Sequence, residues 1–181
     1  DDEIARLGYR TTPAMGVSII AKQLQADGKY LAGVPGFYRA ENGDWTFVRE
    51  ARGILIPVRD RNDLIQGLQI RLDNVQRRKF RWVSSAERMD GCKAEGWVHI
   101  AGEVSAKMIL TEGPMKADVI HALSGHSVIA VPGVNSLLRL KPVLEDLRKC
   151  GLTEIKTAFD MDFSTNRHVQ DGLRDLLALL D

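Results

Sequence analysis

Three acidic residues stand where apolar runs of the sequence stop. Glu112 ends the stretch "KMILTEG" (107–113), and Asp160 and Asp162 end the stretch "EIKTAFDMD" (154–162). Two carboxylates spaced two residues apart on an extended chain point to the same side, and neighbouring carboxylates are unfavourable unless a proton or a cation neutralises them. Mg²⁺ or Mn²⁺ prefers such oxygen ligands and can bridge to phosphate oxygens. Gly113 leaves the room that a metal or a phosphate needs beside Glu112.

Each of these acids has a simpler interpretation when it is taken alone. An Asp or Glu at a strand end is often a helix N-cap or a solvated loop residue. The combination is more specific, because the lengths between the three acids fit consecutive strand–helix units. We therefore interpret Glu112, Asp160 and Asp162 together as a candidate metal site.

The elements that position these acids alternate regularly from residue 107 onward. The sequence predicts strands at 107–113, 127–133 and 154–162, and helices at 115–125, 135–151 and 166–180. This alternation indicates right-handed crossovers and a parallel sheet with helices on its faces. Ligands of such sheets bind at the carboxyl ends of the strands, which is where the three acids lie.

The first part of the chain has a different pattern. Short helices are predicted around 2–7 and 15–26, followed by a passage rich in Gly and Pro at 28–47. Strands of antiparallel character are predicted at 53–60, 64–72, 78–85 and 96–102, the first two joined by a turn at 61–63. We therefore expect a smaller α+β subdomain at 1–104 and an α/β domain at 105–181.

Composition narrows the classes of protein to consider. The chain has 181 residues, 44% of them hydrophobic, and a formal net charge of +1. A role with nucleic acid must therefore rest on local clusters of Lys and Arg. Cys92 and Cys150 lie far apart in the sequence, which argues against a zinc site and a disulfide framework and favours a reducing, cytoplasmic location.

Two features concern the context of the chain. Its apolar runs are much shorter than the roughly 20 residues of a membrane span, so we expect no membrane association. The sequence starts with "DDEIARLGYR", in a helical pattern and without a Met. We expect it to be a piece of a longer protein.

The acids and their surroundings resemble the Toprim family, the metal-binding domain shared by bacterial replicative primases, topoisomerases and certain nucleases. The hallmark of that family is a Glu-Gly after the first strand and an Asp-x-Asp after the third, matched here by Glu112–Gly113 and by Asp160–Met161–Asp162. The stretch "EGPMKADVIHAL" is similar to the primase version, in which the following helix carries a further acid, here Asp118.

The resemblance to primases extends upstream of the Toprim motifs. "RGILIPVRDRNDLIQGLQIRLDN" followed by "RRKFRWVSSAE" is similar to the segment that precedes the Toprim domain in primases. Arg52, Arg71 and Lys79 match positions that form a basic surface facing template and nucleotides in that family. Lys116 is a further expected contact to phosphate. The overall pattern is similar to that of primase-like Toprim proteins carried on phages, plasmids and integrated elements.

This resemblance implies a primase-like nucleotidyltransferase that uses Mg²⁺ or Mn²⁺, single-stranded DNA and nucleotides, with a helicase as a further partner. Glu112 is either a metal ligand or the base that takes the hydroxyl proton. Two other functions stay open: a metal-dependent DNA nuclease of Toprim type, and a nucleic-acid-binding module that has lost its activity.

Two further groups of residues have alternative interpretations. The cluster "RRKFRW" (77–82) interleaves cations with aromatic residues, a pattern typical of single-strand binding. It is equally typical of a solvated strand face with Phe80 and Trp82 packed inward. The histidines at 99, 121, 126 and 168 have unrelated spacings and are more typical of structural or surface residues than of ligands.

Overall fold

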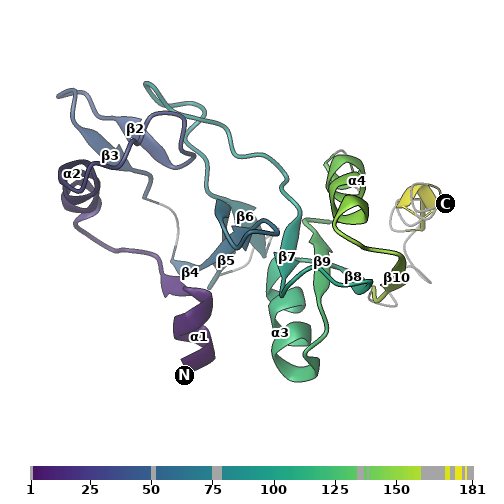
Figure 1. Cartoon of the computed structure of the whole chain (residues 1–181). Helices are drawn as coiled ribbons and strands as arrows, with labels where there is room; N and C mark the ends of the chain where they lie inside the picture. The colour runs from purple at the N-terminus through teal and green to yellow at the C-terminus, as the bar shows by residue number, and fades with distance from the viewer. Residues whose placement is uncertain are drawn as a thin grey trace. The chain divides into compact units, whose positions relative to one another are not determined.

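The computed structural model describes residues 2–49, 52–74, 79–133, 137, 139–159, 170, 171, 174–176 and 178. The chain forms two compact units (Figure 1). The first comprises Asp1–Pro57 with Gly67–Glu95, and the second comprises Val58–Gln66 with Gly96–Asp181. Across the described residues, no helix has the length and apolar character needed to cross a membrane.

The second unit is built on a four-stranded sheet. Its strands are β7 (His99–Ala101), β8 (Lys107–Glu112), β9 (Val128–Val131) and β10 (Glu154–Thr157), in the order β10-β8-β9-β7. The first three in that order run parallel, as the alternating pattern predicts. The strand predicted at 96–102 lies at the edge of this sheet, where β7 pairs antiparallel with β9 rather than with the strands that precede it.

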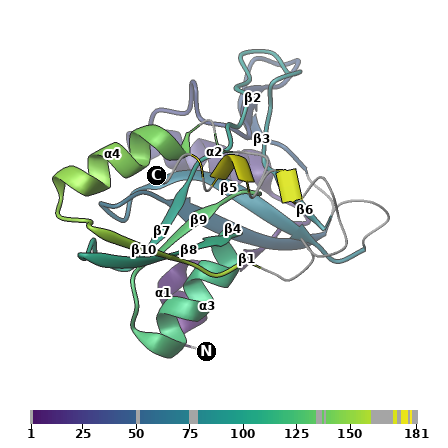
Figure 2. The ribbon, with the colours of Figure 1, turned by 90° about the vertical axis from the view of Figure 1, so that its right-hand side faces the viewer.

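Two helices cover the faces of this sheet. Figure 2 shows α3 (Pro114–Ser124) on one face and α4 (Leu140–Lys149) on the other. All four residues of β9 are buried, as expected for a strand covered on both faces. The two faces differ in side-chain size. Toward α4 lie Met108, Leu110, Ile129, Val131, Leu140, Leu144 and Leu147; toward α3 lie Ala101, Ala117, Val128 and Ala130.

Helical residues also occur near the end of the chain. The described residues 170, 171, 174–176 and 178 are helical, within the range 166–180 where the sequence predicts a helix. Leu176 is fully buried and belongs to the same core as the large side chains of α4. This α/β arrangement confirms the predicted fold class of the second unit.

The first unit contains short helices and antiparallel strands. The helices α1 (Asp2–Leu7) and α2 (Val17–Ala26) lie where the sequence predicts them. One sheet has the order β1-β4-β5-β6, and a second sheet pairs β2 with β3. The strands are β1 (Arg10–Thr11), β2 (Phe37–Arg39), β3 (Trp45–Phe47), β4 (Gly53–Arg59), β5 (Ile65–Leu72) and β6 (Phe80–Trp82). The predicted β4–β5 pairing is confirmed, and β6 is shorter than the predicted strand at 78–85.

The β2–β3 hairpin lies in the passage that the sequence analysis treats only as turns. Its two strands pair antiparallel around an Asn42–Gly43 turn, in which the Asp44 backbone N–H donates to Asn42 Oδ1 at 3.1 Å. Gly43 has a φ of 82° there, and an Asn-Gly pair is a strong hairpin signal. Trp45 anchors the hairpin in the core at 7% exposure.

Candidate functional site

Glu112 lies at the carboxyl end of β8, as predicted. It is paired with Val131, the last residue of β9, and the Gly113 backbone N–H donates to the Val131 carbonyl at 2.8 Å. Gly113 then turns the chain with a φ of 77° and a ψ of 129°, a conformation that favours glycine. A Cβ built on Gly113 would meet nothing within 4 Å. Among the described residues the space at Gly113 is therefore open, and the backbone conformation is what favours glycine there.

Lys116 is the nearest described cation to the carboxylate of Glu112. Its Nζ lies 3.4 Å from Glu112 Oε1, one helical turn further along the chain. Both side chains are about one-third exposed, at 33% and 34%. Such a pair is weak in water, so an incoming ligand can replace either partner at low cost.

The chain returns to the same edge of the sheet after β10. Thr157 pairs with Leu110, the Ala158 N–H donates to the Leu110 carbonyl at 2.8 Å, and Thr111 Oγ1 donates to the Ala158 carbonyl at 2.6 Å. Asp160 and Asp162 follow shortly after this point but lie outside the described residues. Within the described part of the chain, no group of three or more His, Cys, Asp and Glu could hold a metal ion. The three-carboxylate site stays a prediction.

Three predicted basic residues meet at one end of the sheet in the first unit. The Asp73 N–H donates to the Arg52 carbonyl at 3.0 Å, and the Leu72 N–H donates to the Lys79 carbonyl at 2.9 Å. Arg71 pairs with Phe80 in the β5–β6 ladder. The backbones of Arg52, Arg71 and Lys79 are thus within one or two residues of each other across neighbouring strands.

The aromatic residues of β6 are only partly consistent with an inward-packed strand. Phe80 is 39% exposed, and Trp82 is half-buried. Arg81 is exposed and lies opposite the fully buried Ile70. Arg77 and Arg78 lie outside the described residues.

This chain is similar to known proteins in structure but not in sequence. No protein-family model matches the chain, and no curated protein is significantly similar to it in sequence. Solved structures of bacterial primases do match. The Aquifex aeolicus primase structure with zinc-binding and RNA polymerase domains matches this chain with a TM-score of 0.68 and 13% sequence identity. The match covers 98% of this chain and 43% of the Aquifex chain. The chain has a primase-like Toprim fold.

Two further solved structures have the same fold. A DNA primase domain from Pseudomonas aeruginosa has a TM-score of 0.66 at 13% identity, over 99% of this chain and 55% of that one. The catalytic domain of a DnaG primase bound to single-stranded DNA has a TM-score of 0.65 at 14% identity, over 97% and 54%. The chain thus spans about half the length of these structures.

In this primase-like Toprim fold, the further acid of α3 is not exposed at the sheet edge. Asp118 is 4% exposed, and its Oδ1 lies 3.0 Å from His99 Nε2. The Arg59 backbone N–H donates to His99 Nδ1 at 2.9 Å, which leaves the Nε2–H of the ring to donate to Asp118. The pair ties β7 to α3. Sequence spacing gave no sign of it, because the two residues are on different elements.

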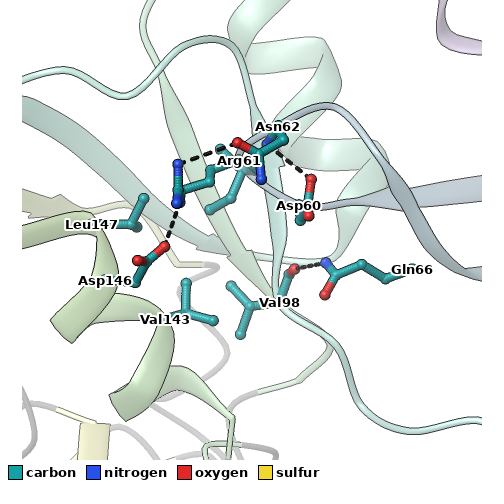
Figure 3. Close-up of a pocket in the computed structure, with 9 residues that line it drawn as sticks. Asp60, Arg61, Asn62, Gln66, Val98, Val143, Asp146 and Leu147 are labelled. Atoms are coloured by element: carbon teal, nitrogen blue, oxygen red, sulfur yellow. Dashed lines mark hydrogen bonds and ion pairs between the residues drawn. The ribbon is translucent and has the colours of Figure 1, made fainter. Parts of the chain in front are cut away.

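A small cavity of about 150 Å³ lies at the 60–66 turn of the second unit (Figure 3). Arg61 and Asp146 of α4 both line it and form an ion pair with each other. The hydrogen bond from Arg61 to Asp146, reinforced by their opposite charges, raises the pKa of the guanidinium. Asp60 accepts the backbone N–H groups of Asn62 and Leu64 at 2.8 and 3.0 Å. These polar groups are bonded to one another and fix the turn against α4.

Proposed function

We propose that the chain catalyses metal-dependent nucleotidyl transfer on single-stranded DNA, as the catalytic core of a primer-synthesising protein. One observation carries this proposal: Glu112 and Gly113 lie at the carboxyl end of β8, beside open space, in a fold shared with primase catalytic cores. A DnaG catalytic domain of this fold has been solved bound to single-stranded DNA. The chain would be part of a larger replication protein of a mobile element, with a helicase as partner.

The proposed metal ligands are Glu112, Asp160 and Asp162. The carboxylate of Glu112 suits Mg²⁺ or Mn²⁺ because it is an oxygen donor that remains one-third exposed, with a 3.4 Å contact to Lys116. A bound Mg²⁺ or Mn²⁺ would polarise the α-phosphate of the nucleotide and offset the negative charge that develops during transfer. Glu112 would act as ligand or as the base for the attacking hydroxyl.

The basic residues have the complementary role of holding phosphates. Lys116 lies one turn from Glu112, so an ammonium released from the carboxylate would remain within reach of a triphosphate. Arg52, Arg71 and Lys79 lie together at one end of a sheet, where several positive charges would bind a phosphate backbone. Their function would be to orient the strand and the nucleotide.

The experiment incubates an end-labelled single-stranded template with nucleotides that carry a second label, and with either Mg²⁺ or Mn²⁺, so that extension is followed by the nucleotide label and cleavage by the template label. We expect products that grow, and we expect Glu112→Gln to lower extension by about 100-fold or more, because either proposed role of the carboxylate is lost. The matched control is Glu154→Gln, which removes a carboxylate at the start of β10. Glu154 pairs with Lys107 at the amino end of β8, whereas Glu112 lies at the carboxyl end of that strand.

The alternative functions give different outcomes in the same assay. Shortening of the labelled strand without extension would favour a nuclease. Metal binding with neither extension nor cleavage would favour a nucleic-acid-binding module without activity. Equal extension by the Glu112→Gln and wild-type proteins would refute the proposed site.

A further inference from the structure

The first turn of α3 places a cation, and no acid, beside the carboxylate of Glu112. Lys116 belongs to that turn, which has no acidic residue, and its Nζ lies 3.4 Å from Glu112 Oε1. The acid that follows on the helix, Asp118, is 4% exposed and lies 3.0 Å from His99 Nε2. The start of α3 therefore presents a positive charge to Glu112.

The backbone that carries Lys116 is fixed, and its side chain is long and partly exposed. Pro114 and Ala117 are buried on either side of it. The N–H groups of Lys116 and Ala117 both donate to the Gly113 carbonyl, at 3.2 and 3.3 Å. The ammonium lies at the end of a flexible four-carbon stem, so it can move toward a new partner while its Cα stays in place.

A second lysine–glutamate pair, at the other end of β8, is tighter. Lys107 Nζ lies 2.7 Å from Glu154 Oε2. This hydrogen bond raises the pKa of Lys107 and lowers the pKa of Glu154. The contact of Lys116 with Glu112 is longer, at 3.4 Å, and such a contact between partly exposed groups is weak in water. Lys116 can therefore leave Glu112 at low cost.

The ammonium of Lys116 and a divalent cation would compete for the Glu112 carboxylate. Lys116 offsets the negative charge of this carboxylate, and its own charge repels a second cation that comes within a few ångströms. A triphosphate changes the balance, because its several negative charges accept charge-assisted hydrogen bonds from an ammonium. A lysine that turns to the triphosphate leaves the carboxylate accessible to a metal ion.

We propose that Lys116 is an exchangeable counter-ion, which pairs with Glu112 before substrate arrives and moves to the triphosphate of a bound nucleotide. Lys116 thus opposes the binding of Mg²⁺ or Mn²⁺ alone and favours their binding together with a nucleotide. The resulting coupling between metal and nucleotide is reciprocal. The inference rests on the proposed function, since it takes Glu112 as a metal ligand and a nucleoside triphosphate as substrate.

The first measurement is the affinity of the full chain for Mn²⁺ alone, from the electron paramagnetic resonance signal of free Mn²⁺ at low salt. The Mn²⁺ that Glu112→Gln no longer binds identifies the site. Lys116→Met keeps the length of the side chain and removes its charge. It should bind this Mn²⁺ about 10-fold more tightly, because competition and repulsion are both lost, and the gain should shrink as salt rises.

The second measurement is the affinity for a fluorescent nucleoside triphosphate in EDTA, where no metal contributes. Lys116→Met should bind it about 3- to 10-fold more weakly, since one charge-assisted contact is lost. Saturating Mn²⁺ should then raise nucleotide affinity by a smaller factor in Lys116→Met than in the wild type. Opposite effects on the two ligands are the signature of exchange, because a purely structural loss would weaken both.

Two variants are matched to Lys116→Met. Lys107→Met removes one charge from the pair with Glu154 at the amino end of β8 and should change neither affinity. Lys116→Arg keeps the charge and should retain both the weak binding of Mn²⁺ and the binding of the nucleotide. A labelled oligothymidylate in EDTA identifies the source of the phosphate: if Lys116→Met weakens only the oligonucleotide, Lys116 contacts the strand and the exchange with triphosphate is overturned.

The remaining outcomes separate the inference from the proposed function. The inference alone is overturned if Lys116→Met binds Mn²⁺ no more tightly than the wild type, or if both affinities fall together. If Glu112→Gln removes no bound Mn²⁺, the proposed metal site is refuted and the inference with it. Opposite effects of Lys116→Met in a protein that never extends a strand would support the exchange and count against nucleotidyl transfer.

Discussion

Ser85→Ala should destabilise the first unit by more than an ordinary surface substitution. The change removes the buried Ser85 hydroxyl, which accepts hydrogen bonds from the backbone N–H groups of Gly36 and Cys92. The same hydroxyl donates to the Phe37 carbonyl. A buried polar group that loses its partner costs about 1–3 kcal/mol. The three contacts share one hydroxyl, so their costs are not additive, and we expect a total loss of about 3 kcal/mol.

Hydrogen exchange at individual amides reads this loss directly. A loss of about 3 kcal/mol corresponds to roughly 100-fold faster exchange at the amides of Gly36 and Cys92, if these amides exchange through opening of the loop from Ser85 to Cys92. Urea unfolding followed by the fluorescence of Trp45 and Trp82, which both belong to the first unit, gives an independent value.

Ser84→Ala is the matched control. Ser84 Oγ accepts one bond from the Ala94 N–H, at 3.3 Å, so its loss should cost less than about 1 kcal/mol. Our reasoning about the loop would be refuted if Ser85→Ala changed the free energy of unfolding by under about 0.5 kcal/mol, or if the two serine variants gave equal losses.

Two further predictions concern the second unit. His99→Leu should cost about 3 kcal/mol because it leaves the buried Asp118 carboxylate without its histidine donor. Thermal or urea unfolding measures this loss. His99→Leu/Asp118→Leu should regain part of it, whereas no recovery would argue against the pair. Gly113→Ala should cost about 1–3 kcal/mol from its positive φ alone, since a Cβ meets nothing there. Gly133→Ala, where a Cβ is equally free of neighbours and φ lies outside the left-handed region, should be nearly neutral. Equal stability of the two glycine variants would contradict the argument from backbone strain.

The parallel strands could be predicted from sequence because their signal is local. β8 and β9 are short apolar runs bounded by turn residues, and burial on both faces is what makes such runs continuous. The edge strand β7 has only three residues, and no sequence pattern near it predicts that it pairs with β9. The turn of the β2–β3 hairpin could have been predicted, because Asn42–Gly43 is a typical hairpin turn. Its strands have three residues each, which is too short for a clear alternation of apolar and polar residues.

The candidate sites also differ in whether a local sequence signal predicts them. Glu112 and Gly113 could be placed from sequence, because a strand end fixes their position on the sheet. Arg49 and Arg88 are 39 positions apart in the numbering, yet both line one cavity. The Ser85 hydroxyl bonds to Gly36 and Phe37, and the Val48 N–H bonds to the Gly36 carbonyl. A contact of that kind depends on tertiary hydrogen bonds, and sequence periodicity carries no information about it.

The unequal side chains on the two faces of the second sheet have a consequence for tolerance to substitution. Ala117 and Ala130 are fully buried toward α3, so an added methyl group would push the helix outward, and Gly113 and Glu112 would move with its first turn. Met108 on the other face is an unbranched, flexible side chain that can adjust to some substitutions around it. In a saturation library, we therefore expect the proposed nucleotidyl transfer to be lost more often through volume increases beneath α3 than through the same increases beneath α4.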